Sequence, residues 1–279
     1  MSDESWLRTG IGDSDADSIT LMGRDLATEL MGRVTLTELS FLLVRGRMPS
    51  EQEARLLDAV LVSLVDHGLT PTVLAARLTH TGAPESIQGA IAAGLLGAGS
   101  VFLGVVEDTA RFLDELLDEV GPDASEARLR EEAERAVGER VAASRRIPGL
   151  GHPVHKAGDP RTPRIYAIAE ETGQLGPHLR LLRVVANAHE EQAGARLPIN
   201  GAGVAGAALA DLGFPAELLR GAALLARTAG LLGHLAEEMR QPLGMRLYRE
   251  IDERAVYEPP AFGDEPPVSG DGPPESADS

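Results

Sequence analysis

Histidine is the side chain in this sequence best suited to proton transfer near neutral pH, and one of the seven histidines lies in a loop suited to ligand binding. His152 follows the run Ile147-Pro148-Gly149-Leu150-Gly151, which is too rich in glycine and proline for a helix interior. Such a loop lets a ligand approach the backbone, and its free N–H groups can bind an anion or a carbonyl oxygen. The alternative is an ordinary helix connection that exposes a histidine, and the residues alone leave both interpretations open.

Basic residues gather around the same loop, although the chain as a whole is acidic. Lys and Arg number 26 against 43 Asp and Glu, which gives a net charge of −17. Between positions 145 and 164 the balance reverses, because only Asp159 opposes the basic residues Arg145, Arg146, Lys156, Arg161 and Arg164. This pattern predicts an anionic ligand such as a phosphate or a carboxylate, and salt bridges within the loop are the alternative explanation.

Composition and spacing exclude several other kinds of chemistry. The acidic surplus repels phosphate backbones and anionic lipid, so neither nucleic acid nor a membrane is an expected partner. The absence of cysteine excludes disulfides, thiolate metal sites and a cysteine nucleophile. His152 and His155 have no third histidine or carboxylate at matching spacing, so no metal site is expected. The glycines between 94 and 99 lack the preceding strand and the Gly-Lys-Ser/Thr ending of a phosphate-binding P-loop.

The elements that must position these residues are predicted to be helices, because Ala, Leu, Glu and Arg dominate the long segments and aromatic residues make up only 3%. Thr35 with Glu38, and Ser50 with Glu53, form capping-box patterns ahead of apolar residues at helical spacing. Helices are predicted at 35–46, 50–68, 70–78, 84–96, 101–117, 125–143, 163–173, 179–192, 203–212 and 215–238. This prediction places His67 at the C-terminus of a helix.

Two motifs resemble those of the citrate synthase family and occur in the same order. The segment from Pro148 to Arg161 matches the family signature Gly-x-Gly-His-x-Val-x-Lys followed by Asp-Pro-Arg. The segment 226–237 is similar to a family helix that contains an Arg, a Gly-His pair and a Glu. Further matches are the stretch 41–49 and the pair Asp66-His67, so the resemblance covers about residues 33–257. The chain looks most like the short citryl-CoA lyases and the citryl-CoA lyase module of ATP-citrate lyase.

The resemblance implies an all-α fold of two helical domains, truncated relative to full-length citrate synthases, in a homodimer that binds an acyl-CoA and an oxo acid or citryl-type acid between its domains. The expected division is an acidic N-terminal segment (1–20), a large domain (21–106 and 211–257), a small domain with the CoA loop (107–210) and a tail (258–279) whose composition predicts disorder. Coenzyme A thioester is then a substrate, and no cofactor is expected. A cytoplasmic location is expected, because the first residues are acidic where a signal peptide is basic.

The same resemblance assigns roles to individual residues. His152 polarises the oxo acid carbonyl or binds the citryl hydroxyl, a role that suits an imidazole N–H. His67 is the second catalytic candidate, and with Arg161 it holds a carboxylate. Further candidates for carboxylate binding are Arg240, Arg246 and His234. The residues expected to bind CoA are Arg145, Arg146, Ile147, Pro148, Gly149, Leu150, Gly151 and Lys156.

Two positions depart from the family pattern. Full citrate synthases carry a Leu-His-Gly-Gly segment whose histidine stabilises an enolate oxygen, and here Phe102 takes its place. The family's Asn-x-Asp-Gly segment, whose aspartate moves a proton at the acetyl methyl group, aligns with Asn200-Gly201-Ala202-Gly203, so Ala202 replaces the aspartate. Asn200 and Asp211 are candidates to substitute for the missing acid. We therefore consider a lyase or condensing enzyme first, a weakly active or inactive acyl-CoA or citrate sensor or partner subunit second, and a helical scaffold without a ligand third.

Overall fold

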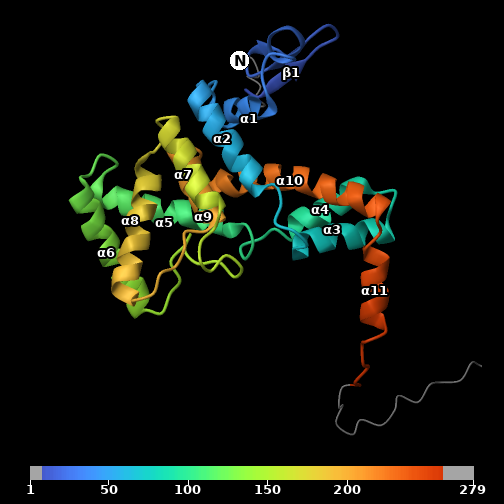
Figure 1. Cartoon of the computed structure of the whole chain (residues 1–279). Coiled ribbons are helices and arrows are strands. Elements are labelled where there is room, and N and C mark those ends of the chain that lie inside the picture. The colour runs from blue at the N-terminus through green and yellow to red at the C-terminus, as the bar shows by residue number, and fades with distance from the viewer. Residues whose placement is uncertain (1–7, 260–279) are drawn as a thin grey trace, which may run out of the picture.

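The computed structural model describes residues 8–259, and these residues form a helical body with two projections (Figure 1). The helices are α1 (Leu36–Arg45), α2 (Glu51–Leu64), α3 (Pro71–Gly82), α4 (Ile87–Leu96), α5 (Gly104–Val120), α6 (Glu126–Ala142), α7 (Arg161–Glu171), α8 (Pro177–Ala193), α9 (Gly201–Asp211), α10 (Ala216–Arg240) and α11 (Gly244–Asp252). All-α architecture is thus confirmed for most of the chain. None of the described helices combines the length and apolar composition that crossing a membrane requires.

Helix starts follow the predicted capping chemistry. The side chains of Thr35 and Ser50 each accept a hydrogen bond from the backbone N–H three residues later. In turn, the side chains of Glu38 and Glu53 accept from the backbone N–H of Thr35 and Ser50. Gly46 ends α1 in the left-handed conformation at φ 70°, where a glycine carries no steric penalty. The predicted starts of several later helices are off by two or three residues, which is the usual uncertainty of helix ends.

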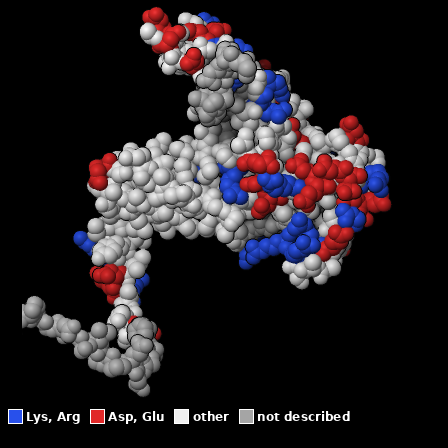
Figure 2. All heavy atoms as spheres, turned by 180° about the vertical axis from the view of Figure 1, so that it is seen from behind, with Lys and Arg blue, Asp and Glu red and all other residues white. Residues whose placement is uncertain are grey.

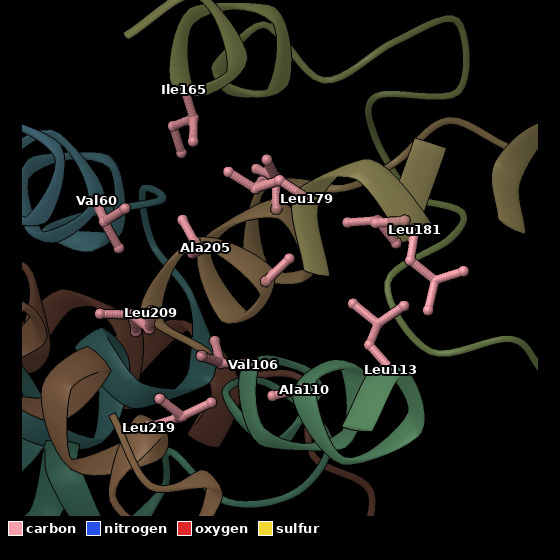
Figure 3. Close-up of a cluster of buried hydrophobic side chains, with 14 of the residues drawn as sticks. Val60, Val106, Ala110, Leu113, Ile165, Leu179, Leu181, Ala205, Leu209 and Leu219 are labelled. Carbon is pink, nitrogen blue, oxygen red and sulfur yellow. The ribbon is translucent and has the colours of Figure 1, made fainter. Parts of the chain in front are cut away.

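Helix α9 occupies the centre of the main core, where its small residues allow close packing. Every residue from Gly203 to Leu209 is buried. A Cβ on Gly206 would overlap the carbonyl of Val106, so the glycine is what lets α9 approach α5. Around it, side chains from α2, α5, α7, α8 and α10 converge on Ala205 and Leu209 (Figure 3). This packing holds the N-terminus of α9 at a defined place, which matters for the site.

The structure corrects the predictions at both ends of the described chain. Residues expected to belong to the acidic segment (1–20) and to the start of the large helical domain form an antiparallel sheet of β1 (Gly12–Ser14), β2 (Ile19–Leu21) and β3 (Arg24–Asp25), followed by a π-helical turn at Leu26–Leu30. These strands are too short to show a period-two pattern. Helix α11 was not predicted, and His67 lies three residues beyond α2 rather than at its end. The predicted disordered tail falls almost wholly outside the described residues.

Candidate active site

The glycine-rich loop is held against the segment that precedes α9. Gly151 N–H donates to the Pro198 carbonyl (2.7 Å), and Asn200 N–H donates to the Gly149 carbonyl (2.9 Å). The Asn200 side chain donates to the Gly151 carbonyl (2.9 Å) and accepts from Gly203 N–H (2.8 Å), which caps α9. Both loop glycines have φ 81°, which few other residues adopt. The loop is therefore a fixed structure, and Asn200 has a structural role in it.

Arg161, at the start of α7, is oriented by a buried carboxylate. The two oxygens of Asp159 accept from Arg161 Nε (2.9 Å) and Nη2 (2.7 Å), and Asp159 also accepts from Gly201 N–H (2.7 Å). Burial raises the pKa of Asp159, but these hydrogen bonds and the guanidinium charge outweigh it and hold the pKa well below its usual range. A Cβ on Gly201 would overlap the guanidinium. Arg161 is thus packed tightly in one orientation at the N-terminus of α9.

His152 is held in one tautomer by the backbone that follows it. Its Nδ1 accepts from Val154 N–H (3.1 Å) and His155 N–H (2.9 Å). In the neutral ring the proton therefore lies on Nε2, and a second proton on Nδ1 would face two N–H donors. Burial, and after it the proximity of His155 and His67, lowers the pKa of His152. His152 can therefore offer a neutral N–H donor to a carbonyl or alkoxide oxygen.

Three histidines meet at this point, although one is far away in sequence. The ring centroids of His152 and His155 are 4.5 Å apart, and that of His67 lies 5.2 Å from His152 and 5.6 Å from His155. Their potential ligand nitrogens all lie within 4.8 Å of one another, so a third histidine joins the pair in space although none has matching spacing in the sequence. Spacing missed His67 because it comes from the segment after α2. Metal binding through His152 would still require Nε2 to lose its proton, so the fit to a metal is poor.

Arg227 of α10 is a candidate ligand-binding residue that the predicted set did not include. Its side chain is buried, its Nη1 has no hydrogen-bond partner among the described residues, and the nearest carboxylate, Asp66, is 3.8 Å away. Burial, and to a lesser degree the repulsion of Arg161, lowers the pKa of Arg227 against the attraction of Asp66. A buried guanidinium with spare donors is suited to a carboxylate ligand. A lone arginine in the apolar run of α10 was the sequence signal for it.

These residues line one cavity of about 1420 Å³. Its walls include His67, His152, Arg161, Arg227, Asn200, Ala202 and Phe102. They also include most of the residues expected to bind CoA, namely Arg145, Arg146, Ile147, Pro148, Gly149, Leu150 and Gly151. Arg140 adds a further cation at that end, where it stacks on Phe112 at 4.4 Å and donates to the Arg146 carbonyl (3.1 Å).

Four of the predicted site residues are not brought to this cavity in the described part of the chain. Lys156 is absent from its lining, and so are Arg240 and Arg246. Arg246 is 76% exposed on α11 and pairs with Glu250 (2.8 Å). His234 Nε2 bonds to Asp66 (2.8 Å), so His234 orients the residue before His67 instead of lining the cavity. The structure thus gives no support to a carboxylate-binding role for these three residues of α10 and α11.

Asp211, suggested as a replacement for the acid missing at Ala202, is engaged elsewhere. It accepts from His178 N–H (2.9 Å) and Leu179 N–H (3.0 Å), which caps α8, and its Oδ1 lies 2.8 Å from His178 Nδ1. Its side chain is 3% exposed and does not line the cavity among the described residues. Asp211 therefore has a structural role.

A family profile described as "Citrate synthase, C-terminal domain" matches residues 35–250. The chain belongs to the citrate synthase family. Among solved structures, citryl-CoA lyase from Hydrogenobacter thermophilus is similar over 94% of this chain and 98% of its own, with 30% identity and a TM-score of 0.81. The resemblance seen in the sequence motifs, including the likeness to short citryl-CoA lyases, is thereby confirmed.

Longer relatives share the fold over only part of their length. ATP citrate lyase from Methanothrix soehngenii, solved with citrate and coenzyme A, aligns over 94% of this chain and 43% of its own, with 24% identity and a TM-score of 0.74. The citrate synthase-like protein oryE of Aspergillus oryzae is 25% identical over 233 residues, which are 79% of this chain. The chain spans about half (49%) of that relative's length.

Proposed function

We propose that the chain binds a coenzyme A thioester together with an oxo acid or citryl-type acid, and that it cleaves or forms the C–C bond between them, as a citryl-CoA lyase does. One observation carries the proposal: His67, His152, Arg161 and Arg227 line a single cavity that continues to the cationic loop. Two guanidinium groups suit the carboxylates of the acid, and the cations at 140, 145 and 146 suit phosphate groups. The volume of the cavity, about 1420 Å³, exceeds that of pockets for drug-sized ligands, as two substrates bound together require.

The chemistry follows from the hydrogen-bonding state of His152. In the lyase direction the bond between the carbinol carbon and the acyl α-carbon breaks, and its electron pair passes to the α-carbon. The carbinol oxygen becomes a carbonyl as its proton leaves, and the α-carbon takes up a proton. The Nε2–H of His152 stabilises the charge that develops on this oxygen, because the donor is already oriented before reaction.

The departures at Ala202 and Phe102 motivate the second candidate function, a CoA thioester or citrate binder with little or no turnover. Neither side chain can exchange a proton with the α-carbon. General acid–base catalysis contributes about 10²–10⁴-fold to a rate, so we expect turnover slower by that order than an aspartate at 202 would support. The residues suited to the carboxylates and to CoA line the cavity whichever candidate function holds, so both candidates predict ligand binding.

A homodimer is part of the proposal, supported by an uncharged stripe on α10. Leu218, Leu225, Leu232 and Met239 recur every seven residues and are between 39% and 59% exposed. The other exposed positions between 218 and 233 are glycine or alanine. The surface over α3, α4 and the later half of α10 carries almost no charge in a chain of net charge −17 (Figure 2). Exposed apolar faces of this extent mark protein interfaces.

The test is incubation of the purified chain with citryl-CoA, with acetyl-CoA, oxaloacetate, citrate and free CoA followed by mass spectrometry. We expect acetyl-CoA and oxaloacetate from the wild type, loss of both in His152→Ala, and faster formation in Ala202→Asp. Thermal midpoints measured with the same ligand separate binding from turnover. A raised midpoint without products in the wild type contradicts the lyase and supports the binder. No product and no change in midpoint would contradict both candidates.

A further inference from the structure

Three exposed apolar side chains, here called the apolar wall, are part of the lining of the cavity that His67 and His152 also line. Leu69 is 54% exposed, Val101 79% and Phe102 46%, and all three line the same cavity as His67. Large apolar groups exposed together in a cleft are unusual in a folded chain and mark a binding surface. The proposed reaction, as described so far, gives these three side chains no role.

The turn that carries Val101 and Phe102 is held by its own backbone. The N–H groups of residues 102, 103 and 104 all donate to the Gly99 carbonyl, at 3.3, 3.0 and 3.1 Å. Ala98 and Leu103 on either side are buried at 3% and 4% exposure, so they anchor the turn in the core. Between these two anchors, the side chains of Val101 and Phe102 stay exposed at the cavity.

The lining is also apolar at position 202, where the family has an acid. Ala202 contributes a methyl group, and Leu150 and Leu197 lie in the same cavity wall. The segments 69–72 and 99–104 contain no charged residue. A chain of methylene groups in contact with these residues would therefore meet carbon, and would leave no buried charge unpaired.

The two components of the reaction differ in which wall they fit. The oxo acid carries carboxylates and needs Arg161, Arg227 and the N–H of His152. The apolar wall suits the part of the thioester that carries no charge, its acyl chain.

We propose that the thioester substrate carries an apolar acyl chain longer than acetyl, held against Leu69, Val101 and Phe102. This inference rests on the proposed function, because it names the substrate class of the same site. Each methylene group that becomes buried tightens binding about fourfold. Hexanoyl-CoA has four more methylene groups than acetyl-CoA, and burial of half of them gives a Kd more than tenfold lower.

The test is calorimetric titration of the purified chain with CoA, acetyl-CoA, butanoyl-CoA and hexanoyl-CoA. We expect Kd to fall along this series, and the fall to be largely lost in Phe102→Ser and in Leu69→Ser. Leu96→Ser is the matched control, because Leu96 is an 85% exposed leucine that is not part of the cavity lining, so the full chain-length dependence should persist.

The outcomes separate this inference from the proposed function. Tight binding of CoA and acetyl-CoA with no change along the series overturns the acyl-chain wall and leaves the proposed function in place. A chain-length dependence that survives in both Phe102→Ser and Leu69→Ser also overturns the wall, because the chain must then lie elsewhere. Failure of CoA and every thioester to bind overturns both proposals.

Discussion

At the scale of single residues, hydrogen-bond partners favour different charge states for His152 and His178. His152 presents Nδ1 to two backbone N–H groups, which disfavours a second proton. His178 lies instead between two carboxylates, with Nδ1 2.8 Å from Asp211 and Nε2 2.8 Å from Asp114. Burial lowers the pKa of His178, but the hydrogen bonds and charges of the two aspartates outweigh it, so the net pKa is raised. The same residue type thus favours the neutral form at position 152 in the cavity and the cation at position 178 between two aspartates.

The raised pKa of His178 predicts a pH-dependent contribution to stability. A group whose pKa is higher in the folded than in the unfolded state stabilises fully below its unfolded pKa of about 6.5, and this stabilisation is lost as pH rises through the folded value. We expect His178→Gln to lower the free energy of unfolding by roughly 1–2 kcal/mol more at pH 5.5 than at pH 8.5. Urea unfolding of both chains at the two pH values measures the difference.

His155→Gln provides the comparison for this prediction, since His155 pairs with no carboxylate among the described residues. It should show a much smaller change between the two pH values. An equal loss for His178→Gln at both pH values would mean that His178 contributes as a neutral hydrogen-bonding group and would contradict the ion-pair interpretation.

At the scale of elements, the start of α11 is held by a buried ion pair between α3 and α10. Glu238 of α10 accepts from Arg77 Nε (2.6 Å) and from the N–H groups of Leu243 and Gly244 (3.0 and 2.8 Å), so it caps α11 while pairing with α3. Arg77 and Glu238 have side chains only 3% and 4% exposed. Most of the remaining α11 surface is exposed, and the helix projects from the body (Figure 1).

Glu238→Gln should release α11 and destabilise the chain. The substitution removes the buried carboxylate partner of Arg77 and leaves only the half-exposed Glu237, and loss of a buried partner costs about 3–5 kcal/mol in comparable buried pairs. Glu237→Gln is the matched control, because Glu237 also bonds to Arg77 but is 48% exposed, and such pairs contribute about 1 kcal/mol or less. Urea unfolding gives the stability, and hydrogen exchange of residues 243–252 reports on α11. Similar losses in the two variants would show that burial of the pair does not govern the attachment.

Local signals predicted the elements well where they were strong. The capping boxes at Thr35 and Ser50 gave the correct helix starts, because the residues that satisfy the first N–H groups are adjacent in sequence. Helix α11 was missed because its start is set by Glu238, which belongs to another helix. The strands near the N-terminus were missed because two or three residues carry no usable period.

The candidate site was also predicted best where its residues are close together in the sequence. The loop before His152 is contiguous, so its glycines and arginines could be recognised together, and the family motif supplied Arg161. His67 and His152 come together, and Arg227 reaches the cavity, only because α2, α7, α9 and α10 pack against one another. No local sequence pattern encodes this packing. Arg240 and Arg246, suggested by the resemblance alone, are not among the residues that line the cavity in the described part of the chain.

At the scale of the whole molecule, the distribution of charge restricts how two copies can meet. A net charge of −17 on each chain opposes association through any charged surface. The stripe Leu218, Leu225, Leu232 and Met239 offers a contact without buried charge, and its repeat of seven residues lets two α10 helices pack side by side. Salt screens the repulsion between the chains and strengthens apolar contact, so the proposed dimer should tighten as salt increases.

The double variant Leu225→Glu with Leu232→Glu should convert the dimer into a monomer, because each interface would then bury four unpaired carboxylates. Leu36→Glu, at a leucine 69% exposed at the start of α1, is the control and should remain dimeric. Light scattering after size-exclusion chromatography measures the mass at low and high salt. A wild-type chain that is monomeric at micromolar concentration in high salt would contradict the dimer. A double variant that stays dimeric would place the interface elsewhere, since two acidic side chains in the stripe cannot be tolerated within a close helix pair.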